Sequence, residues 1–132
     1  MTWDAVPSWL VVMLVCAAGS AGAVCRFMVD GVVKARVGAR FPWGTLAVNV
    51  SGSLVLGVVT GIVVFHDAAP QWQQVLGVGF CGGYTTFSTA SFESVRLVQQ
   101  GRAAAGAANV FGSVAVTAAA AAIGLSTDAV AL

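Results

Sequence analysis

A run of glycine, hydroxyl and aromatic residues interrupts the apolar segment between Trp72 and Phe92. Its sequence is Gly82-Gly83-Tyr84-Thr85-Thr86-Phe87-Ser88-Thr89. Glycine costs a helix about 1 kcal/mol relative to alanine, and hydroxyl groups compete for backbone hydrogen bonds, so these residue types predict a broken helix. A break exposes carbonyls at the end of one half-helix, which attract cations, and amide donors at the start of the next, which attract anions. The run therefore has the chemistry of an ion site, in which we expect Gly82 and Gly83 to turn the chain through positive φ angles.

Phe87 follows this expected break and stands among hydroxyl residues. An aromatic ring has a positive edge, so a phenylalanine presented edge-on favours an anion without trapping it. Weak binding suits conduction, because an ion that is held too tightly does not leave. The alternative interpretation is that Phe87 is an ordinary core or lipid-facing side chain.

The composition indicates a membrane protein. Of the 132 residues, 58% are hydrophobic and only 8% are charged, whereas a soluble domain has about 25% charged residues. Four apolar stretches reach the length of about 20 residues that spans a bilayer. They cover residues 8 to about 33, 43 to 65, 72 to 92, and 103 to about 127. We therefore expect one all-α domain over residues 1–132, with four transmembrane helices and a break in the third.

Charged residues at the ends of these stretches predict their orientation. Lys34, Arg36 and Arg40 lie in the first connection, and Arg96 and Arg102 flank the third, so the basic loops share one side. Because basic loops favour the cytoplasm, we expect both termini outside. The first stretch is too long for a cleaved signal peptide and lacks a basic start, so we expect it to be retained.

Small or polar residues recur every four positions within the first, second and fourth stretches, which places them on one face of each helix. Small residues on such faces allow close helix packing in lipid. Four polar residues are harder to explain by packing: Arg26, Asn49, Ser53 and Ser113. Polar groups at depth in a bilayer are costly, and they mark a pathway or a buried pair. For Arg26, an ion pair with Asp30 and snorkelling to the interface are alternatives to an ion-attracting role.

Several other classes of protein do not fit the sequence. Cys16, Cys25 and Cys81 lie in apolar runs without the spacing of a metal site or a disulfide framework. A net charge of +1 gives no basis for nucleic-acid binding. His66 has no nucleophile arranged to use it, so we expect no enzymatic activity.

Motifs in all four stretches resemble those of the CrcB/Fluc fluoride channels. The run at 82–89 is similar to the third-helix signature of that family, and Ser113 with the small residues after it is similar to the fourth. Gly44-Thr45-Leu46-Ala47-Val48-Asn49 resembles the second-helix motif, and Gly22-Ala23-Val24-Cys25-Arg26 resembles the first. The likeness covers the whole chain, in the same order and with matching spacing.

The resemblance implies a dual-topology dimer, in which two four-helix subunits pack antiparallel around two fluoride pores. It implies a structural, non-transported sodium ion held by the backbone carbonyls of Gly82 and Thr85. The implied role is export of cytoplasmic fluoride across the cell membrane, down its gradient, which relieves toxicity. The implied pore residues are Asn49 as an anion-facing amide, Phe87 as a ring whose edge meets fluoride, the hydroxyls of Thr86, Ser88, Thr89 and Ser113, and Arg26 as a source of positive potential.

Two residues depart from the family pattern. Ala90 stands where the family has a second pore phenylalanine, and Asn109 where we expect an aromatic residue, so the pore is expected to be asymmetric. The strong bias of the basic loops also opposes insertion in both orientations. We therefore expect this subunit to pair with an oppositely inserted paralogue, with a symmetric homodimer as the alternative.

Two other functions fit parts of the sequence. A small four-helix multidrug or cation exporter needs an embedded carboxylate in its first span, and Asp30 lies at the end of that span. A helix-binding scaffold would use only the small-residue stripes. It would predict that Asn49→Ala or Phe87→Ile leaves fluoride transport unchanged.

Overall fold

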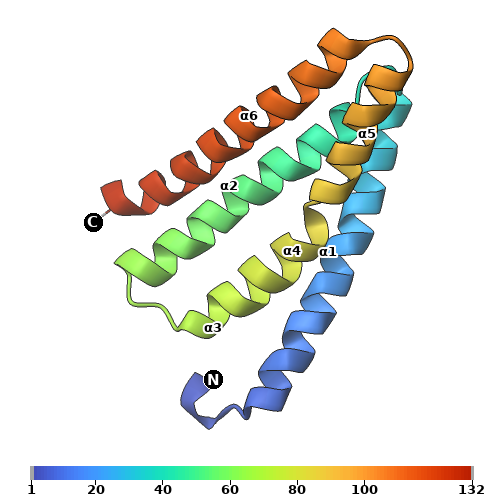
Figure 1. The fold of residues 1–132 in the computed structure, drawn as a ribbon. Helices are drawn as coiled ribbons and strands as arrows, with labels where there is room; N and C mark the ends of the chain where they lie inside the picture. The colour runs from blue at the N-terminus through green and yellow to red at the C-terminus, as the bar shows by residue number, and fades with distance from the viewer. Residues whose placement is uncertain (1, 132) are drawn as a thin grey trace.

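A computed structural model describes residues 2–131, and all the regular elements within them are helices. The chain begins with a 3₁₀ turn, η1 (Trp3–Ala5), followed by α1 (Ser8–Val37) and α2 (Trp43–Phe65). The third span is composite and consists of α3 (Pro70–Trp72), η2 (Gln73–Cys81), α4 (Gly82–Tyr84) and α5 (Phe87–Gln99). The last helix is α6 (Ala103–Val130), which runs back along α2 (Figure 1).

Three helices are long and apolar enough to cross a membrane, namely α1, α2 and α6. These correspond to the first, second and fourth predicted spans, and α2 has the predicted bounds. Helix α1 continues to Val37, beyond the predicted end near residue 33, and stops at Gly38, whose φ of 79° is accessible to glycine. The third span extends from 70 to 99 rather than 72 to 92, because charged and amide residues continue α5 past its apolar part.

The predicted break is present, but the paired glycines do not make it. The two residues outside helical geometry are Thr85, with φ −82° and ψ 160°, and Thr86, with φ −150° and ψ 117°. Gly82 is helical, with φ −62° and ψ −40°. Among the described residues, the glycines with positive φ are Gly38 and Gly101, so the expectation that Gly82 and Gly83 turn the chain is wrong.

Glycine is needed in the third span because this segment packs directly on the backbone of α1. A Cβ atom added at Gly79 would lie 2.9 Å from the Val15 carbonyl oxygen, and one added at Gly83 would overlap the Gly19 carbonyl. This segment is also wound more widely than an α-helix. Its nine residues from Gln73 to Cys81 form a π-helix, in which the Gly82 amide reaches the Gly77 carbonyl five residues back.

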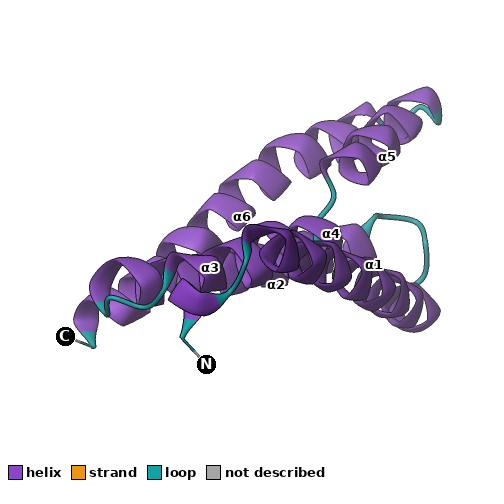
Figure 2. Ribbon diagram, turned by 90° about the horizontal axis from the view of Figure 1, so that it is seen from below, coloured by secondary structure: helices purple, strands orange, loops and turns teal. Residues whose placement is uncertain are grey.

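The break moves the chain from one helix layer to another. Before it, η2 and α4 pack on α1, with further contacts to α2. After it, α5 packs mainly on α6. Figure 2 shows the connecting loop crossing from α4 to α5, which lies beside the start of α6 and apart from α1.

The two basic loops lie together at one end of the molecule, as the sequence predicts. The Arg102 guanidinium donates to the Arg40 carbonyl and so ties the loop before α6 to the loop before α2. At the other end, the rings of Trp3 and Trp72 pack edge to face with centroids 5.4 Å apart. Few large apolar side chains are buried, and many on every long helix are exposed. Such surfaces suit lipid or another membrane subunit, and the chain is a multi-pass membrane protein.

Candidate ion site at the helix break

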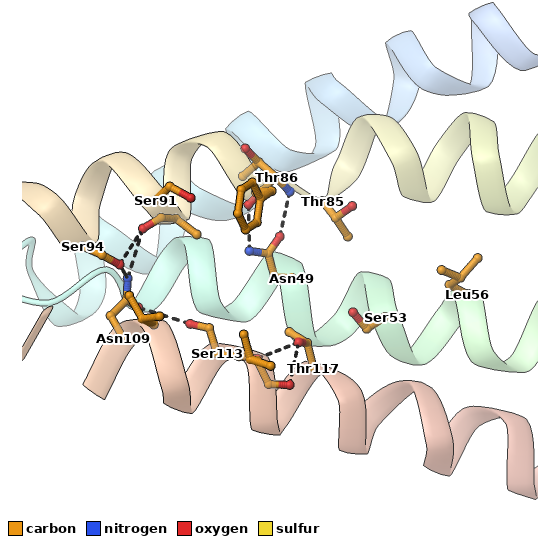
Figure 3. Close-up of a pocket in the computed structure, with 14 residues that line it drawn as sticks. Asn49, Ser53, Leu56, Thr85, Thr86, Ser91, Ser94, Asn109, Ser113 and Thr117 are labelled. Carbon is orange, nitrogen blue, oxygen red and sulfur yellow. Dashed lines mark hydrogen bonds between the residues drawn. The ribbon is translucent and has the colours of Figure 1, made fainter. Parts of the chain in front are cut away.

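Asn49 on α2 holds the extended backbone of Thr86 in place (Figure 3). Its Nδ2 donates to the Thr86 carbonyl at 3.0 Å, and its Oδ1 accepts from the Thr86 amide at 2.7 Å. A backbone amide only donates and a carbonyl only accepts, so this pair fixes which way the side-chain amide points. The predicted anion-facing amide therefore uses its oxygen and one N–H to stabilise the break. Its second N–H makes no hydrogen bond within residues 2–131.

These bonds release carbonyls that a continuous helix would occupy. In an α-helix, the Thr86 amide would donate to Gly82 and the Thr89 amide to Thr85. Instead, the Thr86 amide bonds to Asn49, and the Thr89 amide bonds to the Thr86 hydroxyl at 3.1 Å, which caps α5. The two carbonyls predicted to hold sodium are thus the ones that lose their helical donors.

Arg26 reaches this break from α1. Its Nη1 donates to the Thr85 carbonyl at a rather long 3.4 Å. Asp30 instead pairs with Lys34, at 2.6 Å, and this is the one ion pair among residues 2–131. The alternative in which Asp30 pairs with Arg26 is therefore wrong.

A pocket of about 330 Å³ opens beside the break. It lies between α2, α5 and α6, and Figure 3 shows polar side chains from all three facing it. The residues singled out from the sequence that line it are Asn49, Ser53, Thr85, Thr86, Phe87 and Ser113. Four others lie outside its lining, namely Arg26, Gly82, Ser88 and Thr89.

Phe87 stands at the start of α5 and is 86% exposed. An exposed side chain is not part of the core of this chain, so the core alternative is wrong, whereas a lipid-facing Phe87 stays an alternative to the pore role. Ser88 and Thr89 are exposed as well. Their predicted contacts with an ion remain predictions, which require another molecule to cover this face.

A family model described as CrcB-like protein, Camphor Resistance (CrcB), matches residues 13–125. The chain belongs to the CrcB family. It is 56% identical to the fluoride-specific ion channel FluC 1 of Leifsonia xyli subsp. xyli, over 69% of this chain and 66% of that protein. It is 41% identical to the fluoride-specific ion channel FluC of Nitrobacter winogradskyi, over 83% of this chain and 87% of that protein. It is 44% identical to the fluoride-specific ion channel FluC 1 of Frankia casuarinae, over 89% of this chain and 92% of that protein.

At the two positions where this CrcB chain departs from the expected pattern, the structure has a hydrogen-bond network instead of aromatic rings. Asn109 is 3% exposed, and its Nδ2 donates to Ser94 Oγ at 2.8 Å and to the Ala90 carbonyl at 3.4 Å. The carbonyl only accepts, so the side-chain oxygen of Asn109 must face Ser113, whose hydroxyl donates to it at 3.3 Å. Ser113, predicted as a pore hydroxyl, therefore gives its proton to Asn109.

Two hydroxyls in the pocket are absent from the implied pore residues, although their protons are not used by any hydrogen bond within residues 2–131, and the first of them is among the polar residues that packing does not explain. These are Ser53 on α2 and Ser91 on α5. Other hydroxyls bond to carbonyls, such as Ser94 to Ala90 at 2.7 Å and Thr117 to Ser113 at 2.6 Å. Ser91 lies four residues after Phe87, so helical spacing alone would have placed it on the same face.

Proposed function

We propose that this chain is one subunit of a fluoride-selective channel, through which cytoplasmic fluoride leaves the cell down its electrochemical gradient. Export would lower the toxicity of the ion. Membership of the CrcB family supports the proposal, as do relatives named fluoride-specific ion channels that share 41% to 56% of their aligned residues. The observation that carries it is the pocket at the broken third span, where proton donors and an aromatic ring gather within a membrane protein.

Fluoride is a small anion that accepts hydrogen bonds, so a pore must replace its water with other donors. The pocket offers the second N–H of Asn49 and the hydroxyls of Ser53 and Ser91. The first amides of α5 have no acceptor within the helix, and the helix dipole adds positive potential there. The edge of Phe87 would add a weak anion contact. Several weak donors suit passage better than one strong site.

A second subunit would complete this path. Phe87, Ser88 and Thr89 face outward from the chain, and Gly82 is exposed with open space around it. An antiparallel partner packed on this surface would enclose the exposed ring between the two chains. Two such subunits related by a twofold axis would form two pores.

The residues at the break fit a structural sodium ion. Carbonyl oxygens are suitable ligands for a hard cation, and those of Gly82 and Thr85 lack their helical donors. Two carbonyls from one chain do not complete a coordination shell, so the partner would supply the others. The ion would join the two subunits without being transported.

We propose that the partner is an oppositely inserted paralogue, with a homodimer as the alternative. The basic residues of both loops gather at one end, and Arg102 ties those loops together. A concentration of positive charge at one end favours a single orientation. Mapping the accessibility of cysteines placed at the termini tests this, and equal populations of both orientations would favour the homodimer.

The cation-exporter alternative is less well supported by the contacts of Asp30. A proton-coupled exporter needs a carboxylate that is free to exchange a proton for its substrate. Asp30 Oδ2 is bound to Lys34 at 2.6 Å. The polar side chains that face the pocket are neutral amides and hydroxyls, which suit conduction of an anion.

Fluoride efflux from proteoliposomes tests the proposal. The chain is reconstituted alone, and then together with a homologue of opposite charge bias, and released fluoride is measured with a fluoride electrode after the membrane potential is short-circuited. We expect efflux of fluoride with little chloride, and loss of efflux when subunits are assembled without sodium. Absence of fluoride efflux with every partner, from protein that elutes as a folded dimer, would contradict the proposal.

A further inference from the structure

We infer that a second pocket, at the basic end of the molecule, binds the phosphate of an anionic phospholipid. This pocket has a volume of about 280 Å³ and lies between the end of α1, the loop before α2, and α5. Three basic side chains line it, and each comes from a different one of these elements: Lys34, Arg40 and Arg96. The site does not depend on which ion the channel conducts.

The charges in the pocket leave two guanidinium groups available. Lys34 is paired with Asp30, whereas Arg40 and Arg96 take part in no ion pair within residues 2–131. Glu93 also lines the pocket, and its Oε2 is buried without a hydrogen-bond partner. With Lys34 paired to Asp30, the two guanidinium groups face this one acid and leave an excess of positive charge. Guanidinium groups suit phosphate oxygens because their paired N–H donors match them.

The loop that carries Arg40 is held in place. The Arg102 guanidinium donates to the Arg40 carbonyl, so the position of this backbone is fixed from the start of α6. The pocket thus has a cation on a tethered loop facing one on a helix. Such an arrangement differs from an exposed basic tail, in which each charge moves independently.

Aromatic residues place this pocket at the level of lipid headgroups. Phe41 forms part of its wall, and the ring of Phe41 packs on Trp43 with centroids 4.8 Å apart. Trp43 is 48% exposed, and tryptophan concentrates where the membrane meets water. We therefore expect the phosphate that binds here to be that of a lipid headgroup. Basic pockets between helices on the cytoplasmic side are known sites for anionic headgroups.

The pocket is separate from the ion site at the break. Helix α5 contributes Ala90 and Ser94 to the ion site, and Arg96 and Gln100 to the basic pocket. The two linings have no residue in common, and the α5 residues of the basic pocket lie nearer the end of that helix than those of the ion site. A lipid in the basic pocket would be held beside the pore without standing in it, and would favour the orientation that places this end in the more anionic leaflet.

Native mass spectrometry of the purified protein, with added phosphatidylglycerol or phosphatidylcholine, tests this inference. We expect phosphatidylglycerol to be retained in preference. Arg40→Gln and Arg96→Gln should each weaken its retention about fivefold, which is the effect of removing one cation near a charged lipid surface. Arg36→Gln is the matched control, because Arg36 carries the same charge at the exposed end of α1 and does not line the pocket.

Three outcomes would overturn the inference. They are equal retention of the two lipids by the wild-type protein, a loss in Arg36→Gln as large as in the pocket variants, and binding of inorganic phosphate alone as tight as that of phosphatidylglycerol. If a glutamine variant does not elute at the volume of the wild-type protein, Arg40→Lys and Arg96→Lys replace it. These keep the charge but lose the paired donors, and should weaken retention about twofold.

Discussion

The half of the third span before the break packs on α1 through backbone atoms at glycines, whereas the half after it is held to α6 by side-chain hydrogen bonds. On the first half, Gly79 and Gly83 lie so close to α1 that neither has room for a Cβ atom. On the second half, Ser94 of α5 is 6% exposed and bonds to Asn109 of α6 at 2.8 Å. Gly106 also brings α6 near the Ser94 carbonyl, but the directed contacts there are hydrogen bonds.

Because of this difference, one span both packs tightly against α1 and presents the start of α5 to the pocket. Backbone packing fixes the depth and rotation of the first half, because a side chain at Gly79 or Gly83 would collide with α1. Hydrogen bonds to α6 aim the second half so that its amino end faces the pocket. Asn49 joins the two halves by holding the extended residue between them.

The largest effect is expected from a side chain placed in the backbone contact. Gly83→Leu should destabilise the protein by about 3 kcal/mol or more, because the new atoms overlap the Gly19 carbonyl and a backbone cannot move aside. Thermal unfolding in detergent and gel filtration measure this. Gly31→Leu is the matched control, since Gly31 is also on a helix but has open space around it. Similar losses in both variants would refute the role given to close packing.

A smaller effect is expected from removing the residue that joins the halves. Asn49→Leu leaves the amide and carbonyl of Thr86 without partners, at a cost of about 2 kcal/mol, and should reduce fluoride efflux more than tenfold. Asn49→Asp keeps an acceptor for the Thr86 amide but loses the donor to its carbonyl. Its stability should therefore fall between those of the wild type and Asn49→Leu. Unfolding midpoints and efflux rates measured together would show whether this order holds.

A smaller loss of stability is expected from removing the hydrogen bonds between α5 and α6. Asn109→Leu removes the bonds to Ser94 and Ala90 and should cost about 1 kcal/mol, because the Ser94 hydroxyl keeps its bond to the Ala90 carbonyl. Hydrogen exchange should rise in α5 but not in η2. Ser113→Ala removes only the 3.3 Å bond at the edge of this network and is the milder control. Faster exchange in both halves would show that they are not held independently.

The smallest effect on stability is expected from the exposed ring. Phe87→Ile should change the free energy of unfolding by no more than about 0.5 kcal/mol, because the side chain is 86% exposed in the subunit. Fluoride efflux should nevertheless fall severalfold, since isoleucine has no positive ring edge. Unchanged efflux would support the scaffold interpretation over the channel.

Hydropathy and residue type were sufficient to locate the spans and the broken one among them. They assigned the wrong cause to the break. Gly82 and Gly83 suggested a turn because glycine tolerates positive φ, yet both stay helical and the extended residues are Thr85 and Thr86. The sequence next to the break does not contain the reason, since the stabilising amide of Asn49 comes from another helix.

The roles of individual hydroxyls could not be read from the sequence in the same way. A serine predicts a donor, but its single proton goes to whichever acceptor lies nearest. Ser113 gives its proton to Asn109, whereas Ser53 and Ser91 keep theirs for the pocket. Side-chain partners of this kind depend on how helices face one another, which periodicity along each helix does not determine.

The sequence alone determined that the chain is a membrane protein, where its helices begin and end to within about four residues except at the end of the third span, that this span is interrupted, and that the basic loops share one end. These properties follow from local composition, because apolar length, charge and helix propensity act along a single segment. Only the tertiary structure decided where the interruption falls and which donors face the pocket. Backbone groups at a break take the partners that neighbouring helices present, and those partners come from distant parts of the chain.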